Sequence, residues 1–315
     1  MTVPIILDVD TGLDDALALL YAVASPGLDL LGVTCVAGNV GLEHVVPNTL
    51  GVLGASGAVP VPVAAGADRP LSGPIVRADE VHGTDGLGGV VLREPWALDP
   101  RSAIDLLTDV IVGHPEPVHL IAVGPLTNVA RLLTERRGVA AQLASIFVMG
   151  GSAFAGGNVT AAAEFNFAAD PEAAHIVVTS GLPVTLYGLD VFNPVVVADA
   201  SVDSLADSVL PSARLAAEVM RASCALWSCD EAPLGDAGAV ICFEHGVFLE
   251  RSPYLAAVEC AGDHTRGQLV VERRPEASRR TNALDGGTVL LGESIDAVGV
   301  AEHFVQTLLS RSRHL

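Results

Sequence analysis

Short apolar runs alternate with segments of helical periodicity through most of the first two hundred residues. We assign β-strands near 4–9, 29–36, 61–64, 117–123, 144–149 and 183–188, and helices near 13–25, 41–56, 101–113, 126–135 and 170–180. Several of these strands are apolar on both faces, which is typical of a parallel sheet covered by helices on each side. The pattern therefore predicts an open, mostly parallel, Rossmann-like α/β sheet flanked by helices.

Two parts of the chain depart from this alternation. Residues 66–95 are rich in Gly, Pro, Asp and Arg, and a loop of this length in a compact protein is usually functional, often a lid. Beyond 199 we expect a helix over about 201–229, two or three strands that include 254–260 and 267–273, and a closing helix near 294–310. Because no internal repeat or low-complexity linker interrupts the chain, the pattern favours a single domain over 1–315.

The charge of the chain limits its partners. Seventeen basic residues against thirty-seven acidic ones give a net charge of −20. This charge opposes binding to phosphate backbones and anionic membranes, so we expect neither nucleic acid nor a membrane as partner; the charge can equally serve solubility alone. The sequence contains no Lys, which removes Schiff-base chemistry and the P-loop lysine from consideration.

The cysteines and the N-terminus bear on the compartment. Five cysteines, an odd number in apolar or helical contexts, indicate reduced thiols in a cytoplasmic protein. No second pair or His cluster accompanies Cys224 and Cys229, so a structural zinc site is not favoured. The first apolar run ends at Asp8 without a basic region before it, which indicates a buried strand rather than a signal peptide.

Four carboxylates follow the first predicted strand within eight positions: Asp8, Asp10, Asp14 and Asp15. Gly12 supplies a tight turn between strand and helix, and the last two acids fall in the first helical turn, where they complement the helix dipole. Capping alone is an alternative, but caps favour a single acidic position. Like charges this close repel, so folded proteins usually divide them among hydrogen bonds, caps and metal ions.

Further acids, amides and one histidine fall at strand ends or in Gly-rich turns: Asn39, His82, Asn158, Glu164, Asn166 and Asp236. The carboxyl ends of parallel strands are where ligands collect in such sheets. Hard oxygen donors without a His or Cys cluster describe a Ca²⁺ or Mg²⁺ site better than a zinc or iron site. Several acceptors around that site suit a substrate rich in hydroxyl groups, such as a sugar.

An ordered set of motifs resembles the inosine-uridine-preferring nucleoside hydrolases. The first block is DVDTGLDDA at 8–16, followed by VAGN at 36–39, GADRPL at 66–71, VHG at 81–83, GLG at 86–88, GPLTN at 124–128, MGG at 149–151, GN at 157–158, AEFN at 163–166 and DPEAA at 170–174. The later part matches less well, through DV at 190–191 and GDAGA at 235–239. The resemblance implies the nucleoside hydrolase fold, a tightly bound Ca²⁺, hydrolysis of ribonucleosides to ribose and free nucleobase, and a homodimer or homotetramer.

The resemblance also divides the site residues between a metal ion and a sugar. The implied calcium ligands are Asp10, Asp15, Asp236 and the backbone carbonyl of Val123, with two ribose hydroxyls and one water completing the shell. The implied sugar-binding residues are Asp14, Asn39, Met149, Asn158, Glu164, Phe165 and Asn166. Asp10 is in addition the general base that activates the metal-bound water, and Asp8 supports the loop from behind.

The resemblance weakens on the nucleobase side. In the well-known branches a His or a Trp precedes the last calcium-binding Asp, whereas this chain has Gly235, as in a less characterised bacterial branch that lacks the His. The usual leaving-group acid is therefore absent, and purine or pyrimidine preference stays open. We assign His82 to protonation of the base and Trp227 to stacking on it; the alternatives are a surface loop histidine and a core aromatic residue. Weaker substitutes for the acid are Cys229, Asp230 and His245.

Two rival functions use the same residues. Asp8 to Thr11 also satisfies the DxDxT motif of haloacid dehalogenase-type phosphatases, but those enzymes normally need a Lys that this chain lacks. The second rival is a ribose- or nucleoside-binding protein that has lost turnover together with the histidine. An intact Asp10 argues against that second interpretation.

Overall fold

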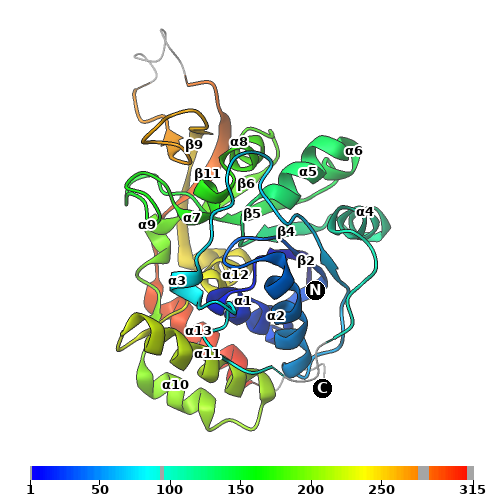
Figure 1. Cartoon of the computed structure of the whole chain (residues 1–315), viewed down its shortest axis with the longest axis vertical. Helices are drawn as coiled ribbons and strands as arrows, with labels where there is room; N and C mark the ends of the chain where they lie inside the picture. Colours follow the sequence, from blue (N-terminus) through cyan, green and yellow to red (C-terminus); the bar gives the residue numbers. More distant parts are fainter. Residues whose placement is uncertain (1, 93–95, 276–283, 311–315) are drawn as a thin grey trace.

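The computed structural model describes residues 2–92, 96–275 and 284–310. Its centre is a nine-stranded sheet with the order β10-β9-β11-β6-β5-β4-β1-β2-β3 (Figure 1). The strands of this sheet are β1 (Val3–Val9), β2 (Leu28–Cys35), β3 (Val63–Ala65), β4 (His119–Ala122), β5 (Ser145–Met149), β6 (Val184–Tyr187), β9 (Leu249–Val258), β10 (Leu269–Val271) and β11 (Gly287–Ile295). Neighbours from β3 to β11 pair in parallel, whereas β9 pairs antiparallel with β11 and β10. The predicted open, mostly parallel α/β sheet is confirmed.

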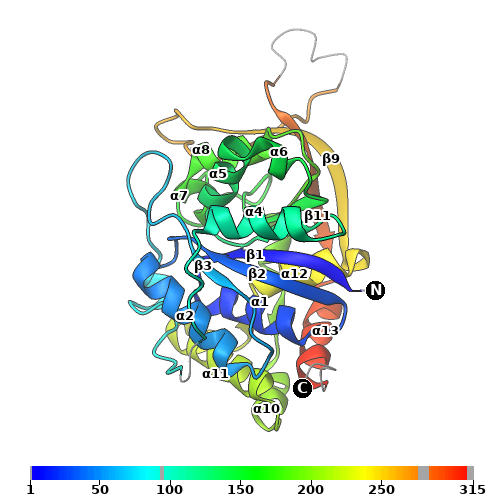
Figure 2. The ribbon, with the colours of Figure 1, turned by 90° about the vertical axis from the view of Figure 1, so that its right-hand side faces the viewer.

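Helices cover both faces of the sheet, as Figure 2 shows. One face packs against α4 (Ala103–Gly113), α5 (Thr127–Glu135) and α8 (Pro171–Val178), and the other against α1 (Leu13–Ala24), α2 (Leu42–Ala55) and α12 (Asp236–Glu244). Further from the sheet, α11 (Pro211–Trp227) and α13 (Ala297–Leu309) pack on α1. The shorter elements are α3 (Asp79–His82), α6 (Arg137–Ala140), α7 (Phe165–Ala169), α9 (Leu189–Phe192), α10 (Asp199–Ala206), η1 (Gly246–Phe248) and a small sheet of β7 (Val196–Val197) with β8 (Ala232–Pro233). Among the described residues, none of these helices combines the length and apolar character that crossing a membrane requires.

The alternation of side chains in β1 explains why its sequence is apolar throughout. Ile5 and Leu7 belong to one core cluster and Ile6 to the other, and all three are fully buried. Successive side chains of a strand point to opposite faces, and helices cover both faces here. The strand therefore delivers its last residues to the carboxyl edge of the sheet from a rigid, buried base.

The helical stretch predicted over about 201–229 is confirmed in the main, but the chain forms two helices there rather than one. The first, α10, ends at Ala206, and α11 begins at Pro211. Proline disfavours helical geometry in the residue before it but is well placed at the first position of a new helix. Leu210 is accordingly extended, with φ −80° and ψ 128°.

The C-terminal segment also differs from the prediction. Of the two or three strands expected, the position of β11 was not predicted, and the closing helix begins at Ala297 rather than near 294. Asp296 fixes this start by accepting a hydrogen bond from the Gly299 N–H at 3.0 Å. Two glycines weaken the local signal of β11, yet β6 on one side and β9 on the other complete its hydrogen bonds.

The expected lid lies over the carboxyl edge of the sheet. In its described part, 66–92, the only helix is the short α3, which ends at His82. The N–H of Ala78 donates to the carbonyl of Asn39 at 3.0 Å, which docks the start of this helix onto the loop after β2. The fold thereby brings a distant loop against the polar residues that follow β1 and β2.

Candidate active site

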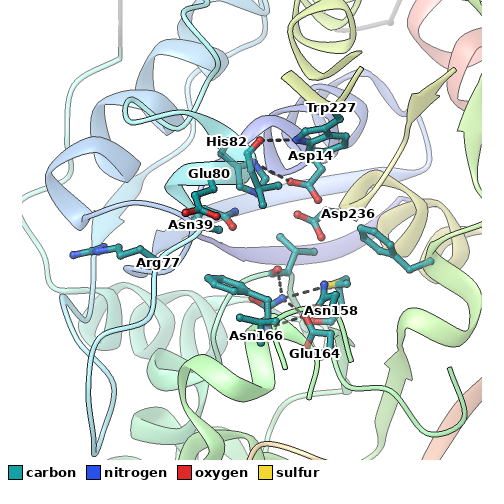
Figure 3. A pocket seen from close by; sticks show the side chains of 17 residues that line it. Asp14, Asn39, Arg77, Glu80, His82, Asn158, Glu164, Asn166, Trp227 and Asp236 are labelled. Atoms are coloured by element: carbon teal, nitrogen blue, oxygen red, sulfur yellow. Dashed lines mark hydrogen bonds and ion pairs between the residues drawn. The ribbon is translucent and has the colours of Figure 1, made fainter. Parts of the chain in front are cut away.

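A cavity of about 370 Å³ opens at the carboxyl end of the sheet (Figure 3). Most of the residues predicted for the site line it: Asp14, Asn39, His82, Val123, Met149, Asn158, Glu164, Phe165, Asn166, Trp227 and Asp236. Of the predicted set, Asp10 and Asp15 do not line the cavity and are almost completely buried. The structure therefore brings residues from seven separate motifs to one place.

The turn after β1 is built around the carboxylate of Asp15. Its Oδ1 accepts the Asp10 N–H at 3.0 Å, and its Oδ2 accepts the Gly12 N–H at 2.9 Å and Asn39 Nδ2 at 3.0 Å. The Asn39 N–H donates to Asp10 Oδ2 at 2.7 Å. These bonds fix the two buried acids relative to one another and tie them to the loop after β2.

Four carboxylates gather here: Asp10, Asp14 and Asp15 of the turn after β1, and Asp236 at the start of α12, which we together call the acidic turn. Oxygens of Asp14, Asp15 and Asp236 all lie within 4.8 Å of one another. Oδ1 of Asp10 and Oδ1 of Asp14 are buried and have no hydrogen-bond partner among the described residues. Burial and then the neighbouring carboxylates raise the pKa of Asp15 to about 7, and they hold the pKa values of Asp10 and Asp236 well above the ordinary range. A hard divalent cation would supply the positive charge that this cluster lacks, so the donor set fits such an ion.

Asp8 lies behind the turn rather than in the cavity. Its Oδ1 accepts hydrogen bonds from Thr34 Oγ1 at 2.5 Å and from Asn128 Nδ2 at 2.8 Å, while its Oδ2 is buried with no partner in the ranges that the structure describes. Burial raises the pKa of this carboxyl to about 7. The contacts join β1 to β2 and to the start of α5, which suits a supporting position.

The opposite wall of the cavity is organised by Glu164, the N-cap of α7. This carboxylate accepts the N–H groups of Asn166, Phe167 and Gly151 at 2.8, 3.1 and 2.8 Å, and burial raises its pKa to about 7. Asn166 Nδ2 donates to the carbonyls of Val123 at 2.8 Å and Met149 at 3.1 Å. An anchored amide and a carboxylate therefore face the acidic turn across the cavity, as Figure 3 shows.

His82 is buried at the cavity, so the surface-loop alternative is wrong. The Leu13 N–H, at the first position of α1, donates to His82 Nδ1 at 3.2 Å. Nδ1 is therefore the acceptor, and the proton of the neutral ring is on Nε2. Burial lowers the pKa of His82, opposed in part by Asp14, whose Oδ1 lies 3.9 Å from Nδ1. The positive end of α1 likewise disfavours protonation, as in other sites that use a neutral histidine as a donor.

Gly12 is part of the same arrangement. A Cβ atom on Gly12 would fall 2.6 Å from His82 Nδ1 and 2.8 Å from Asn39 Nδ2. A residue with a side chain would displace both groups. The tight turn that the sequence indicates at Gly12 therefore also makes room for the cavity residues of two other loops.

Trp227 ends α11 at the mouth of the cavity, so it is not the core aromatic residue of the alternative interpretation. Its Nε1 donates to the carbonyl of Val81 at 2.6 Å, and its ring stands edge-on to His82 with centroids 6.3 Å apart. Phe165 and Phe192 also line the cavity. These aromatic faces suit a flat, partly apolar group such as a nucleobase.

Some lining residues were missed by the sequence analysis: Arg77, Ala78, Glu80, Val81, Val159 and Phe192. Phe192 carried a usable signal, because it follows soon after a predicted strand, at the carboxyl edge of the sheet. The weaker substitutes for the leaving-group acid, Cys229, Asp230 and His245, do not line the cavity. Cys229 Sγ lies instead 3.1 Å from Cys224 Sγ, and all five cysteines are free.

Gly235 stands at the position where relatives of the resembling family carry a histidine or a tryptophan, and the local packing favours a glycine there. Its φ is +60°, and a Cβ atom there would fall 2.4 Å from the Cβ of Asp14. A histidine therefore has no room at this position while Asp14 keeps its place. The absence of the usual acid is built into the packing of the acidic turn.

We expect Gly235→Ala to destabilise the protein and to lower kcat/KM by displacing Asp14. Left-handed strain alone costs of order 1–3 kcal/mol, and the contact with Asp14 adds to it. The matched control is Gly89→Ala, because Gly89 has φ +85° but open space around its Cβ position. Thermal unfolding and kcat/KM of both variants separate strain from contact. Equal effects in the two variants would show that the contact with Asp14 is unimportant.

Comparison with known proteins agrees with the resemblance that the sequence motifs indicate. The model of the family described as "Inosine-uridine preferring nucleoside hydrolase" matches residues 5–289. A pyrimidine-specific ribonucleoside hydrolase of Photobacterium profundum is 41% identical over 279 residues, which cover 87% of this chain and 90% of that protein. Among solved structures, a purine-preferring ribonucleoside hydrolase from Gardnerella vaginalis is similar with a TM-score of 0.87 and 26% identity, covering 97% of this chain and 98% of the other. A plant nucleoside hydrolase gives the same TM-score and identity over 98% of this chain and 100% of its own.

Proposed function

The chain belongs to the inosine-uridine preferring nucleoside hydrolase family, and from this premise we propose that it hydrolyses the N-glycosidic bond of ribonucleosides to ribose and free nucleobase. The observation that supports the proposal most strongly is that three different groups of residues meet at one cavity. An acidic, metal-fitting turn, a wall of amide and carboxylate groups, and an aromatic mouth surround the same space. These three parts suit the water, the ribose and the base of one substrate. Membership of the family leaves the phosphatase alternative without support.

The acidic turn is the proposed place of a calcium ion. Asp10, Asp15, Asp236 and the carbonyl of Val123 would hold it, with the oxygens of Asp14 close by. Calcium prefers such hard oxygen donors, and the buried, partnerless oxygens of the turn are what a cation would satisfy. A bound ion of this kind lowers the pKa of a coordinated water and orients the sugar.

The residues of the chain then divide the remaining work. Asp10 Oδ1, which has no donor in the described part of the chain, accepts the proton of the attacking water. Asp14 and Asn166 bind ribose hydroxyls, which selects ribose over 2′-deoxyribose. As the bond to the base lengthens, positive charge develops on the sugar, and the carboxylates of Asp14 and Glu164 stabilise it.

The leaving base needs a donor, and His82 is the residue that we propose for it. As a neutral ring with its proton on Nε2, His82 donates a hydrogen bond rather than a full positive charge. Donation to a base atom that gains negative charge favours departure. Trp227, joined to the backbone beside His82, would stack on the same base.

We expect His82→Ala to slow uridine hydrolysis by about 10²-fold, and hydrolysis of nitrophenyl riboside by far less. The nitrophenolate leaves without help from a donor, whereas a nucleobase does not. His44→Ala is the control, because His44 is exposed on α2. Equal losses on the two substrates would exclude His82 as the donor to the leaving group.

For the base, we propose pyrimidine ribonucleosides as preferred substrates. The support is that curated relatives 36–41% identical to the chain carry the name pyrimidine-specific ribonucleoside hydrolase, whereas the purine-preferring structure is 26% identical. The test is a panel of uridine, cytidine, inosine and adenosine, with release of reducing sugar as the measurement. Faster release from inosine than from uridine would overturn the preference. Binding of ribose without any release would favour the binding-protein alternative.

A further inference from the structure

The carboxylate of Asp190, which lies outside the acidic turn, binds the backbone N–H groups of a loop that leads to the cavity. Asp190, in α9, accepts the N–H of Ala153 on Oδ2 at 2.8 Å, and the N–H groups of Phe154 and Ala155 on Oδ1 at 2.8 and 2.9 Å. Three consecutive backbone donors around one anion form a cradle of the kind that binds anions strongly. Here the anion is a side chain of the protein itself.

The carboxylate of Asp190 makes these three hydrogen bonds to the loop and does not cap its own helix, α9. The N–H groups of Val191 and Phe192 bind the carbonyl of Gly188, and the Leu189 N–H binds the carbonyl of Gly151 at 3.0 Å. These three N–H groups of α9 are therefore satisfied without the carboxylate. All three of its bonds go to the loop that follows β5.

One of these three residues, Phe154, is held a second time through its side chain. The ring of Phe154 lies edge-on to Tyr254 of β9, with centroids 6.3 Å apart, and the guanidinium carbon of Arg273 lies 4.7 Å from the centroid of the Phe154 ring. Backbone and side chain are thus fixed at one point of an otherwise exposed loop.

Only two residues, Gly156 and Gly157, separate this anchored point from Asn158, which lines the cavity. Gly156 has φ +82°, and a Cβ atom on Gly157 would fall 2.1 Å from the carbonyl oxygen of Thr160, so both glycines are held in one tightly packed turn. This turn connects the anchored residues to Asn158. Beyond Asn158 the loop closes on itself, because the Asn158 N–H binds the carbonyl of Ala163 at 3.2 Å. The placement of the Asn158 amide therefore depends on Asp190 from one side and on this turn from the other.

We propose that Asp190 is a positioning residue for the sugar: by holding 153–155 it places Asn158 at the ribose. This inference rests on the proposed function. The same short helix carries Phe192 into the aromatic wall, so α9 connects the sugar loop with the base side of the cavity. Asp190 itself does not line the cavity, which is why its effect must pass through Asn158.

Steady-state kinetics with uridine test the proposal. Asp190→Ala is expected to raise KM about tenfold with kcat changed by less than about threefold, because Asn158 binds the sugar in ground and transition states alike. Asp190→Asn keeps the shape of the side chain but not its charge, and an intermediate KM is expected. Asp296→Ala is the control: it removes a backbone-capping carboxylate at α13, far from the cavity, and leaves KM unchanged.

A double-mutant cycle separates positioning from loss of stability. If Asp190 acts through Asn158, Asp190→Ala has no further effect on KM once Asn158→Ala is present. The proposal would be overturned if KM in the double variant rose by the product of the two single-variant factors, or if KM of Asp190→Ala did not change.

Hydrogen exchange tests the clamp without any turnover. The amides of 153–155 are expected to exchange faster in Asp190→Ala than in the wild type, while those of α13 do not change. Unchanged exchange at 153–155 would overturn the clamp. If wild-type protein released no sugar from any ribonucleoside, the proposed function would fail while the exchange result still decided the role of Asp190.

Discussion

Asp10→Asn is expected to lower kcat for uridine by about 10³-fold, because the change removes the proposed proton acceptor and one negative charge of the metal-fitting turn. The amide keeps the shape of the side chain. Its remaining oxygen can still accept the Asn39 N–H that binds Asp10 Oδ2 at 2.7 Å. The fold of the turn should therefore survive while the chemistry fails.

The matched control for this variant is Asp29→Asn. Asp29 is exposed in β2, on the strand that pairs with β1 but at its amino end, away from the cavity. The control removes the same charge and should leave kcat unchanged. If Asp10→Asn kept more than about a tenth of the wild-type kcat, the base would have to be another residue.

Removal of divalent cations is expected to abolish turnover and to lower the melting temperature. Calcium that binds only the folded state stabilises it by about 2.7 kcal/mol at a hundred times its dissociation constant. The measurement is thermal unfolding after treatment with a chelator, followed by back-titration with Ca²⁺ and, separately, Mg²⁺. An unchanged melting temperature together with undiminished turnover in chelator would contradict a metal site in the acidic turn.

The pH dependence of this effect has a defined sign. Folding raises the pKa of Asp15 from 3.8 to about 7, so the folded protein without metal holds protons that the unfolded chain has released. Its stability is thus greatest below the ordinary pKa and falls as pH rises toward about 7. Added Ca²⁺ should therefore stabilise the protein more at about pH 8 than at about pH 5.5.

Two variants isolate the acidic turn from the general repulsion of a chain with net charge −20. Asp236→Asn should stabilise the chelator-treated protein at about pH 8 and remove most of the stabilisation by Ca²⁺. Asp29→Asn removes an equal charge from the surface. If both variants behaved alike, the pH dependence would come from overall charge and not from the turn.

The acidic turn and its strand could be predicted because their signals are local. An apolar run, a glycine and acids in the first helical turn follow one another without a break, and the structure has β1 and α1 where the periodicity puts them. Pro211 is a local signal for a new helix, but the prediction ran through it because the helical periodicity continues on both sides. By contrast, β11 exists because two neighbouring strands complete it, which no local pattern records.

The candidate site shows the same division. Motif residues such as Asn166 and Asp236 could be named in advance because they stand in Gly-rich turns and in motifs that carry the resemblance. The reason for a glycine at position 235 could not be predicted. It depends on the Cβ of Asp14, which lies 2.4 Å from the place that a Cβ atom of residue 235 would occupy. The partners of Asp190 and the tautomer of His82 likewise depend on backbone groups far away in the sequence. The individual roles of the site residues stay predictions that the variants above test.

The most direct test of the central claim is the release of ribose from uridine and from 2′-deoxyuridine by the calcium-loaded protein. We predict that uridine yields uracil and reducing sugar in equal amounts, and that the deoxynucleoside, which lacks one of the hydroxyls that the acidic turn and Asn166 would bind, is cleaved at least about 10²-fold more slowly. Equal rates on both substrates, or no sugar from uridine and cytidine alike, would contradict the account.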